Sequence, residues 1–143
     1  MAANQAPIYT LSPETTSNTS TGFAGTLLTA TAEYTGVSAT NLLVHTAGVN
    51  GSYIRRLRFK AIGSNVATVA RIYINNGATN ATATNNVFYG EVPLPSTTAS
   101  NTTNTVDIDY SMEFALNASQ RIYVGLGTTV AAGWICVAIA GQY

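Results

Sequence analysis

The fold class is decided by residues 51–77, which read Gly51-Ser-Tyr-Ile-Arg-Arg-Leu-Arg-Phe-Lys-Ala-Ile-Gly-Ser-Asn-Val-Ala-Thr-Val-Ala-Arg-Ile-Tyr-Ile-Asn-Asn-Gly77. Two runs of alternating apolar and polar residues flank a short turn-rich segment at residues 64–67. This arrangement is typical of an antiparallel β-hairpin with one buried face. Five of the six basic residues of the chain also lie here, so we expect the hairpin to have a role in an interface or a binding surface.

The hydrophobic pattern selects one pairing register for the predicted hairpin. Pairing Phe59 with Ile72 keeps one face apolar, whereas a slip of one residue would place isoleucines beside basic side chains. The same register places Lys60 opposite Arg71, and a like-charge pair is destabilising unless an acidic group lies nearby. The polar face of the predicted hairpin carries Arg56, Arg58, Lys60, Arg71 and Tyr73.

Residues 105–116 show the most regular alternation in the chain, which predicts a half-buried strand. The apolar face carries Val106, Ile108, Tyr110, Met112, Phe114 and Leu116. The polar face carries half of the six acidic residues, namely Asp107, Asp109 and Glu113. We expect this acidic face to meet the basic face of the hairpin, either within a subunit or between subunits. The alternative is two solvated charged faces, where each exposed ion pair contributes at most about 1 kcal/mol.

Further short strands are predicted along the rest of the chain. They cover residues 26–32, 42–46, 87–92, 121–126 and 134–140. Short strands separated by turn-rich loops predict an all-β fold, a two-sheet antiparallel sandwich of about eight strands. The long loops at residues 77–86 and 96–104 favour a jelly-roll type over an up-and-down meander.

The length of 143 residues predicts one domain. We assign residues 23–143 to a single β-sandwich domain and residues 1–22 to an extended N-terminal arm, because prolines and polar residues there oppose regular structure. The arm is either a disordered terminus or a segment that lies on a neighbouring subunit. In the second case its anchors would be Ile8, Tyr9 and Leu11.

Residues 134–140 are apolar on both faces, which predicts burial on both sides. One side would face the core. The other would face a partner subunit or lie under a loop, and we favour the subunit interface.

The charge balance argues against several classes of partner. Charged residues make up 8% of the chain and the formal net charge is zero, against about 25% charged residues in ordinary soluble domains. Neither nucleic acid nor an anionic membrane is therefore an expected partner. Low charge suits a protein that works inside an assembly.

No residue pattern predicts catalysis, a metal site or a cofactor. His45 is the only histidine and its strand offers no orienting group, so we interpret it as structural. Cys136 lies in an apolar strand with nothing to lower its pKa. The Asp107-x-Asp109 pair lacks the further oxygen ligands that calcium needs. We therefore expect a protein that is not an enzyme.

Residues 53–77 and 116–143 resemble small virion proteins of tailed bacteriophages, and the likeness covers about residues 50–143. The chain is similar in size and composition to capsid decoration (cement) proteins. This resemblance implies a jelly-roll homotrimer that binds the major capsid protein lattice on the outer capsid surface, after assembly in the host cytoplasm. It gives no residue a catalytic role. The candidate subunit or shell contacts are the three arm anchors and the charged residues of the two polar faces, together with Tyr73.

Two other functions stay open. One is a phage tail or fibre module, which is also structural. The other is a carbohydrate-binding β-sandwich, which would need an exposed aromatic platform. Tyr9, Tyr34, Tyr89 and Tyr143 are too scattered in the sequence to predict one.

Overall fold

The structure is a computed structural model that describes residues 26–27, 29–30 and 33–143. The predicted arm at residues 1–22, with Ile8, Tyr9 and Leu11, lies outside the described residues. The predicted strand at residues 26–32 lies only partly within them.

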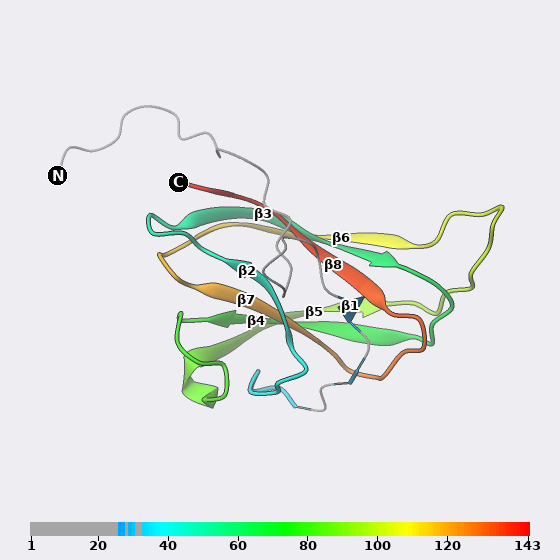
Figure 1. The fold of residues 1–143 in the computed structure, drawn as a ribbon, viewed down its shortest axis with the longest axis horizontal. Helices are drawn as coiled ribbons and strands as arrows, with labels where there is room; N and C mark the ends of the chain where they lie inside the picture. The colour runs from blue at the N-terminus through cyan, green and yellow to red at the C-terminus, as the bar shows by residue number, and fades with distance from the viewer. Residues whose placement is uncertain (1–25, 28, 31–32) are drawn as a thin grey trace.

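The described chain forms two four-stranded antiparallel sheets that pack face to face (Figure 1). Sheet A has the order β1 (Thr26–Leu27), β8 (Trp134–Gln142), β3 (Ser52–Ala61) and β6 (Asp107–Leu116). Sheet B has the order β2 (Leu42–Thr46), β7 (Arg121–Leu126), β4 (Thr68–Asn75) and β5 (Asn86–Leu94). A single turn of 3-10 helix, η1 (Ala83–Asn85), precedes β5. The predicted all-β class and the two-sheet antiparallel sandwich are confirmed.

The strand pairs are nested along the chain. β4 pairs with β5, β3 with β6, β2 with β7 and β1 with β8, all antiparallel. The chain therefore forms one long two-stranded ribbon: it runs from β1 to β4, reverses between β4 and β5, and returns from β5 to β8 antiparallel to its first half. The pairs β3–β8 and β4–β7 then join neighbouring parts of this ribbon into the two sheets.

The predicted hairpin of residues 51–77 is wrong, because β3 and β4 lie in different sheets. Lys60 pairs with Asp107 and Ile135, and Arg71 pairs with Glu91 and Gly125, so these two basic residues are not opposite each other. Alternation defines which face of a strand is buried, but it does not define the neighbouring strand. The two apolar faces meet across the sandwich instead of side by side in one sheet, and the like-charge contact never forms.

The core lies between the sheets and contains the residues that alternation assigned to it. Phe59, Leu57 and Ile72 are completely buried, as are Trp134 and Ile122. In β8, buried residues alternate with half-buried Ile135, Val137 and Ile139 on the outer face of sheet A. The prediction that this strand is apolar and largely covered on both sides is therefore met only in part, since its outer residues keep some exposure.

One end of the sandwich is held together by the buried side chain of Asn65, in the segment between β3 and β4. Its amide nitrogen donates to the carbonyl oxygens of Gly63 at 3.3 Å and Gly133 at 3.1 Å, and to Thr97 Oγ1 at 3.3 Å. Its amide oxygen accepts from the backbone nitrogens of Ala132 at 3.0 Å and Gly133 at 2.7 Å. One side chain thus joins three loops that are far apart in the sequence.

Candidate interaction surfaces

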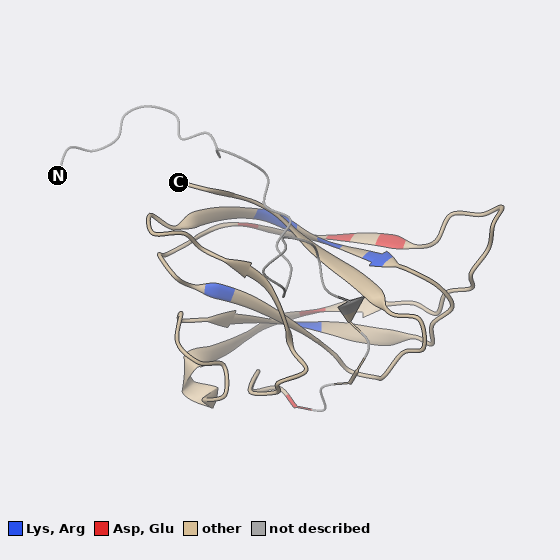
Figure 2. Cartoon of the chain, in the orientation of Figure 1, with Lys and Arg blue, Asp and Glu red and all other residues tan. Residues whose placement is uncertain are grey.

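The outer face of sheet A carries a stripe of paired charges, which we call the charge stripe: Arg56, Arg58, Lys60, Asp107 and Asp109. Arg56 Nη1 lies 3.3 Å from Asp109 Oδ2, and Arg58 Nη2 bonds to Asp107. Lys60 Nζ donates to the backbone oxygen of Thr105 at 2.8 Å. Figure 2 shows the basic and acidic segments side by side on β3 and β6. The predicted meeting of the two faces is confirmed, within one sheet of one subunit.

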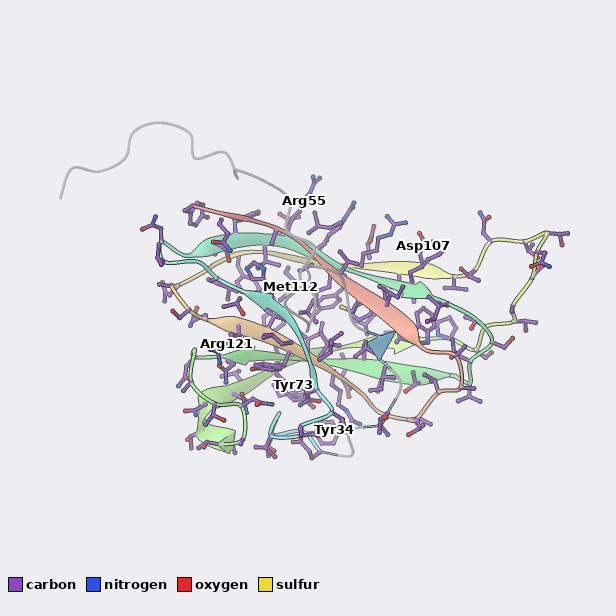
Figure 3. The ribbon with its side chains drawn as sticks, viewed as in Figure 1. Tyr34, Arg55, Tyr73, Asp107, Met112 and Arg121 are labelled. Atoms are coloured by element: carbon purple, nitrogen blue, oxygen red, sulfur yellow. The ribbon has the colours of Figure 1, made fainter. Side chains whose placement is uncertain are left out.

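Glu113, near the other end of β6, also pairs with side chains of β3. Arg55 Nε lies 4.0 Å from its carboxylate, and Tyr53 Oη donates to Glu113 Oε2 at 2.5 Å. This hydrogen bond raises the pKa of the Tyr53 hydroxyl, with burial and the carboxylate charge adding to it. Figure 3 shows Arg55 and Asp107 projecting from the outer side of sheet A. The face therefore carries many charges that compensate one another locally.

Arg71 and Tyr73 do not belong to that face; both lie on sheet B. Arg71 Nε donates to Glu91 Oε1 at 3.0 Å, so its acidic partner comes from β5 and not from residues 105–116. Tyr73 is completely buried and donates to the backbone oxygen of Glu33 at 2.8 Å. Burial raises the pKa of Tyr73 to about 12. The prediction that Arg71 and Tyr73 share a face with the basic residues of β3 is therefore wrong.

Two exposed rings form an aromatic patch on the outer face of sheet B, which we define as Tyr34 and Phe88. Their centroids are 5.4 Å apart with the rings near perpendicular. The guanidinium of Arg71 lies 4.1 Å above the Tyr34 ring, and Arg71 Nη2 donates to Tyr34 Oη at 3.1 Å. Tyr34 remains 56% exposed and Phe88 39% exposed. Figure 3 places Tyr34 and Tyr73 on the side of the molecule opposite Arg55 and Asp107.

The segment that presents Tyr34 is held by its own hydrogen bonds. Burial raises the pKa of Glu33, but hydrogen bonds from Thr35, Ser38 and Gly36 lower it by more, so the carboxylate is stabilised in its ionised form. Asn41 Nδ2 donates to the backbone oxygen of Gly36 at 3.0 Å. The patch cannot be predicted from the sequence, because Tyr34 and Phe88 are distant in the chain and only the fold brings them together.

A second apolar surface lies between the edge strands β5 and β6. We call it the seam and define it as Val87, Tyr89, Ile108, Tyr110 and Phe114. Val87 and Tyr89 are exposed, while the three β6 residues are half-buried and pack against the core. Tyr89 and Phe114 join the two strands, with ring centroids 5.3 Å apart. The predicted apolar face of residues 105–116 is thus confirmed, but part of it stays open to solvent.

His45 and Cys136 carry the side chains that were the candidates for a catalytic role, and both lie in the core. His45 Nε2 lies 2.7 Å from Ser52 Oγ, so this pair connects β2 to β3 across the sandwich. Burial lowers the pKa of His45 to about 4 and raises the pKa of the Cys136 thiol. His45 is therefore neutral at neutral pH and sealed from solvent, as a structural histidine would be.

Within the part of the chain that the structure describes, no three His, Cys, Asp or Glu side chains gather in a way that could hold a metal ion. No helix among those residues is long and apolar enough to cross a membrane. Comparison with protein families, with curated proteins and with solved structures found nothing that matches this chain.

Proposed function

We propose that this chain is a non-enzymatic structural protein of a bacteriophage virion, which decorates and stabilises the capsid by binding the lattice of the major capsid protein. The observation that carries the proposal is the nested pairing of β1 with β8, β2 with β7, β3 with β6 and β4 with β5. We interpret this pairing as a jelly roll, an eight-strand architecture that recurs in viral capsid and lectin domains. The resemblance of residues 53–77 and 116–143 to small virion proteins supports the capsid alternative.

The surface chemistry is consistent with adhesion. Four charges of the charge stripe are used in two internal pairs, Arg56 with Asp109 and Arg58 with Asp107, so a partner that approaches sheet A meets compensated charges there. Several aromatic side chains are exposed, namely Tyr34, Phe88 and Tyr89, and aromatic residues are enriched at interfaces. In this proposal the arm at residues 1–22 adds contacts with the shell through Ile8, Tyr9 and Leu11.

The test is binding of the purified full chain to capsid shells that lack it, measured by co-sedimentation and by heat resistance of the shells. We expect saturable binding and a raised temperature of shell disruption. Deletion of residues 2–21 should weaken binding and leave the thermal unfolding of the domain unchanged. Failure of the full chain to bind any shell, head or tail, would reject the proposal. Binding to tails alone would favour the tail or fibre module.

The aromatic patch favours a second candidate function, carbohydrate binding. Tyr34 is exposed, yet it is fixed by the Arg71 guanidinium and by the edge of Phe88. A fixed, exposed ring offers a stacking surface at little cost in side-chain entropy. Retention on immobilised glycans that is lost in Tyr34→Ala and kept in Tyr143→Ala would support this function over shell binding.

A further inference from the structure

Asparagine precedes glycine at two places in the chain, and both lie in turns. Asn50-Gly51 connects β2 to β3, and Asn76-Gly77 follows β4. This dipeptide is chemically labile, because the backbone nitrogen of the glycine can attack the asparagine carboxamide and glycine has no side chain to hinder the approach. A fold slows the attack when it holds the reacting groups in hydrogen bonds. The bonds of the two turns therefore decide which asparagine reacts.

Asn76 is held at both ends of its carboxamide. Its Oδ1 accepts from the backbone nitrogen of Ala78 at 3.0 Å, and its Nδ2 donates to Asn85 Oδ1 at 3.2 Å. The backbone nitrogen of Gly77 donates to Oδ1 of Asn75 at 2.9 Å, and Asn75 is completely buried. Three hydrogen bonds must therefore break before the nitrogen of Gly77 can reach the carboxamide.

Asn50 is held much less firmly. Its side chain is exposed, and its Nδ2 donates only to the backbone oxygen of Tyr143, at 3.4 Å. That distance is longer than the usual range of about 2.7–3.2 Å, and no described group donates to the carboxamide oxygen of Asn50. The backbone nitrogen of Gly51 donates to the oxygen of Gly48 at 3.0 Å. The attacking nitrogen is thus engaged in both turns, and the carboxamide makes the difference between them.

The fold also requires glycine at position 51. The φ angle of Gly51 is +91°, a backbone conformation that glycine adopts without steric cost. A Cβ at this position would lie 2.5 Å from the backbone oxygen of Leu116. The turn therefore keeps a labile step after Asn50, because a residue with a side chain does not fit there.

We propose that Asn50 is a site of spontaneous deamidation in the folded protein, whereas the fold protects Asn76. The Gly51 nitrogen forms a bond to Cγ of Asn50 as the bond from Cγ to Nδ2 breaks, and Nδ2 leaves as ammonia with the proton of the Gly51 nitrogen. Water then opens the resulting succinimide ring at one of its two carbonyl carbons and leaves aspartate or isoaspartate. Water is the one co-reactant.

The product changes both the charge and the contacts of this turn, which lies beside the C-terminal end of β8 (Figure 1). The new carboxylate adds one negative charge to a chain whose formal net charge is zero. A carboxylate cannot donate to the Tyr143 oxygen as the Asn50 amide does. The Tyr143 nitrogen donates to the Gly51 oxygen at 3.3 Å, so the same turn holds both backbone groups of this residue. We therefore expect residues 141–143 to exchange their amide hydrogens faster after deamidation.

The test is incubation of the full chain at mildly alkaline pH, once folded and once unfolded in guanidinium chloride. Isoelectric focusing counts the acidic forms. Tryptic digestion after unfolding separates the two sites, since Asn50 lies in the peptide that ends at Arg55 and Asn76 in the peptide 72–121. Fragmentation in the mass spectrometer then locates the change from amide to acid.

In the folded chain, Asn50 should react at least roughly fivefold faster than Asn76, because the net contribution of one typical hydrogen bond corresponds to about that factor. In the unfolded chain the two rates should agree within about twofold, since these bonds are absent there. Equal rates in the folded chain, faster reaction at Asn76, or no acidic form in the time that converts the unfolded chain would each overturn the proposal.

Variants provide the matched controls. Asn50→Gln should abolish the main acidic form, because glutamine must close a larger ring and does so far more slowly, whereas Asn76→Gln should leave that form unchanged. Asn50→Asp supplies the product directly and should show the faster exchange at residues 141–143; unchanged exchange would reject the loss of the Tyr143 contact. Thermal unfolding verifies that each variant is folded. None of these measurements depends on shell binding.

Discussion

At the scale of single residues, the fold depends on a few buried polar groups in a chain with little charge. Asn65 uses both ends of its amide to hold three loops. His45 uses its ring to connect the two sheets through Ser52. Such groups stabilise when they are fully satisfied and are costly when one partner is removed.

Asn65→Ala should lower the free energy of unfolding by about 2–4 kcal/mol, because several buried backbone groups lose their partner. Asn65→Asp should cost at least as much, since a carboxylate cannot donate to the Gly63 and Gly133 oxygens. Urea unfolding followed by Trp134 fluorescence measures both. Asn101→Ala, in an exposed loop, is the control and should stay within about 0.5 kcal/mol of wild type. A similarly small effect at Asn65 would contradict the conclusion that its side chain holds the three loops together.

The lowered pKa of His45 predicts that the fold loses stability in acid. Its pKa is about 4 in the fold against roughly 6.5 in an unfolded chain. Between these values the unfolded state binds more protons, so stability rises with pH across the window and falls as pH drops through it. The loss from pH 7 to 4 should reach up to about 3 kcal/mol from this residue. Urea unfolding at a series of pH values should show a shallower dependence in His45→Gln; parallel curves would refute the assignment.

At the scale of elements, ion pairs of different burial should respond differently to salt. Arg58 and Asp107 are each 43% exposed, whereas the Arg71 side chain that pairs with Glu91 is only 10% exposed. Exposed pairs are weak and are screened by salt, and buried pairs are screened much less.

A double-mutant cycle with Arg58→Ala and Asp107→Ala should give a coupling energy of about 0.5–1 kcal/mol that falls toward zero near 1 M NaCl. The cycle with Arg71→Ala and Glu91→Ala should give a larger coupling that persists in salt. Thermal or urea unfolding at two salt concentrations measures both couplings. Equal salt dependence in the two cycles would show that burial does not separate them.

Sequence alternation predicted the strands well and their neighbours poorly. Residues 42–46 and 121–126 were predicted with the bounds that the structure has, and the inward face of residues 105–116 was right. The predicted pairing within residues 51–77 is wrong, because two strands that follow each other in the sequence lie in different sheets. The acidic partners of Arg56 and Arg58 could be predicted because the chain has few charges and half of its acidic residues lie on one strand. The contact between Tyr34 and Phe88 could not be predicted, because only the fold brings them together.

At the scale of the whole molecule, the nested ribbon joins segments from opposite ends of the sequence. β1 pairs with β8 at Thr26 and Ile135, and β8 also pairs with β3. Bringing such distant segments together costs chain entropy before the contacts within the sheets stabilise the fold. Topologies of this kind therefore fold slowly.

Refolding from urea, followed by Trp134 fluorescence in stopped flow, should therefore take on the order of milliseconds to seconds. Removing residues 134–143 should prevent folding, because β8 lies between β1 and β3 in sheet A. Removing residues 2–21 should leave the rate within about twofold, since every strand of the two described sheets lies within residues 26–142. Microsecond refolding would mean that local contacts dominate.

The placement of the basic residues has a consequence for proteolysis. All six lie inside strands: Arg55, Arg56, Arg58 and Lys60 in β3, Arg71 in β4 and Arg121 in β7. Trypsin cleaves after lysine and arginine, so the long loops at residues 76–82, 95–106 and 127–133 offer it no target. Tryptic digestion should therefore proceed only through molecules whose sheets have opened, and its rate would report the population of those molecules. A protease that cleaves after aromatic residues would instead find an exposed target outside the strands at Tyr34 in the folded chain.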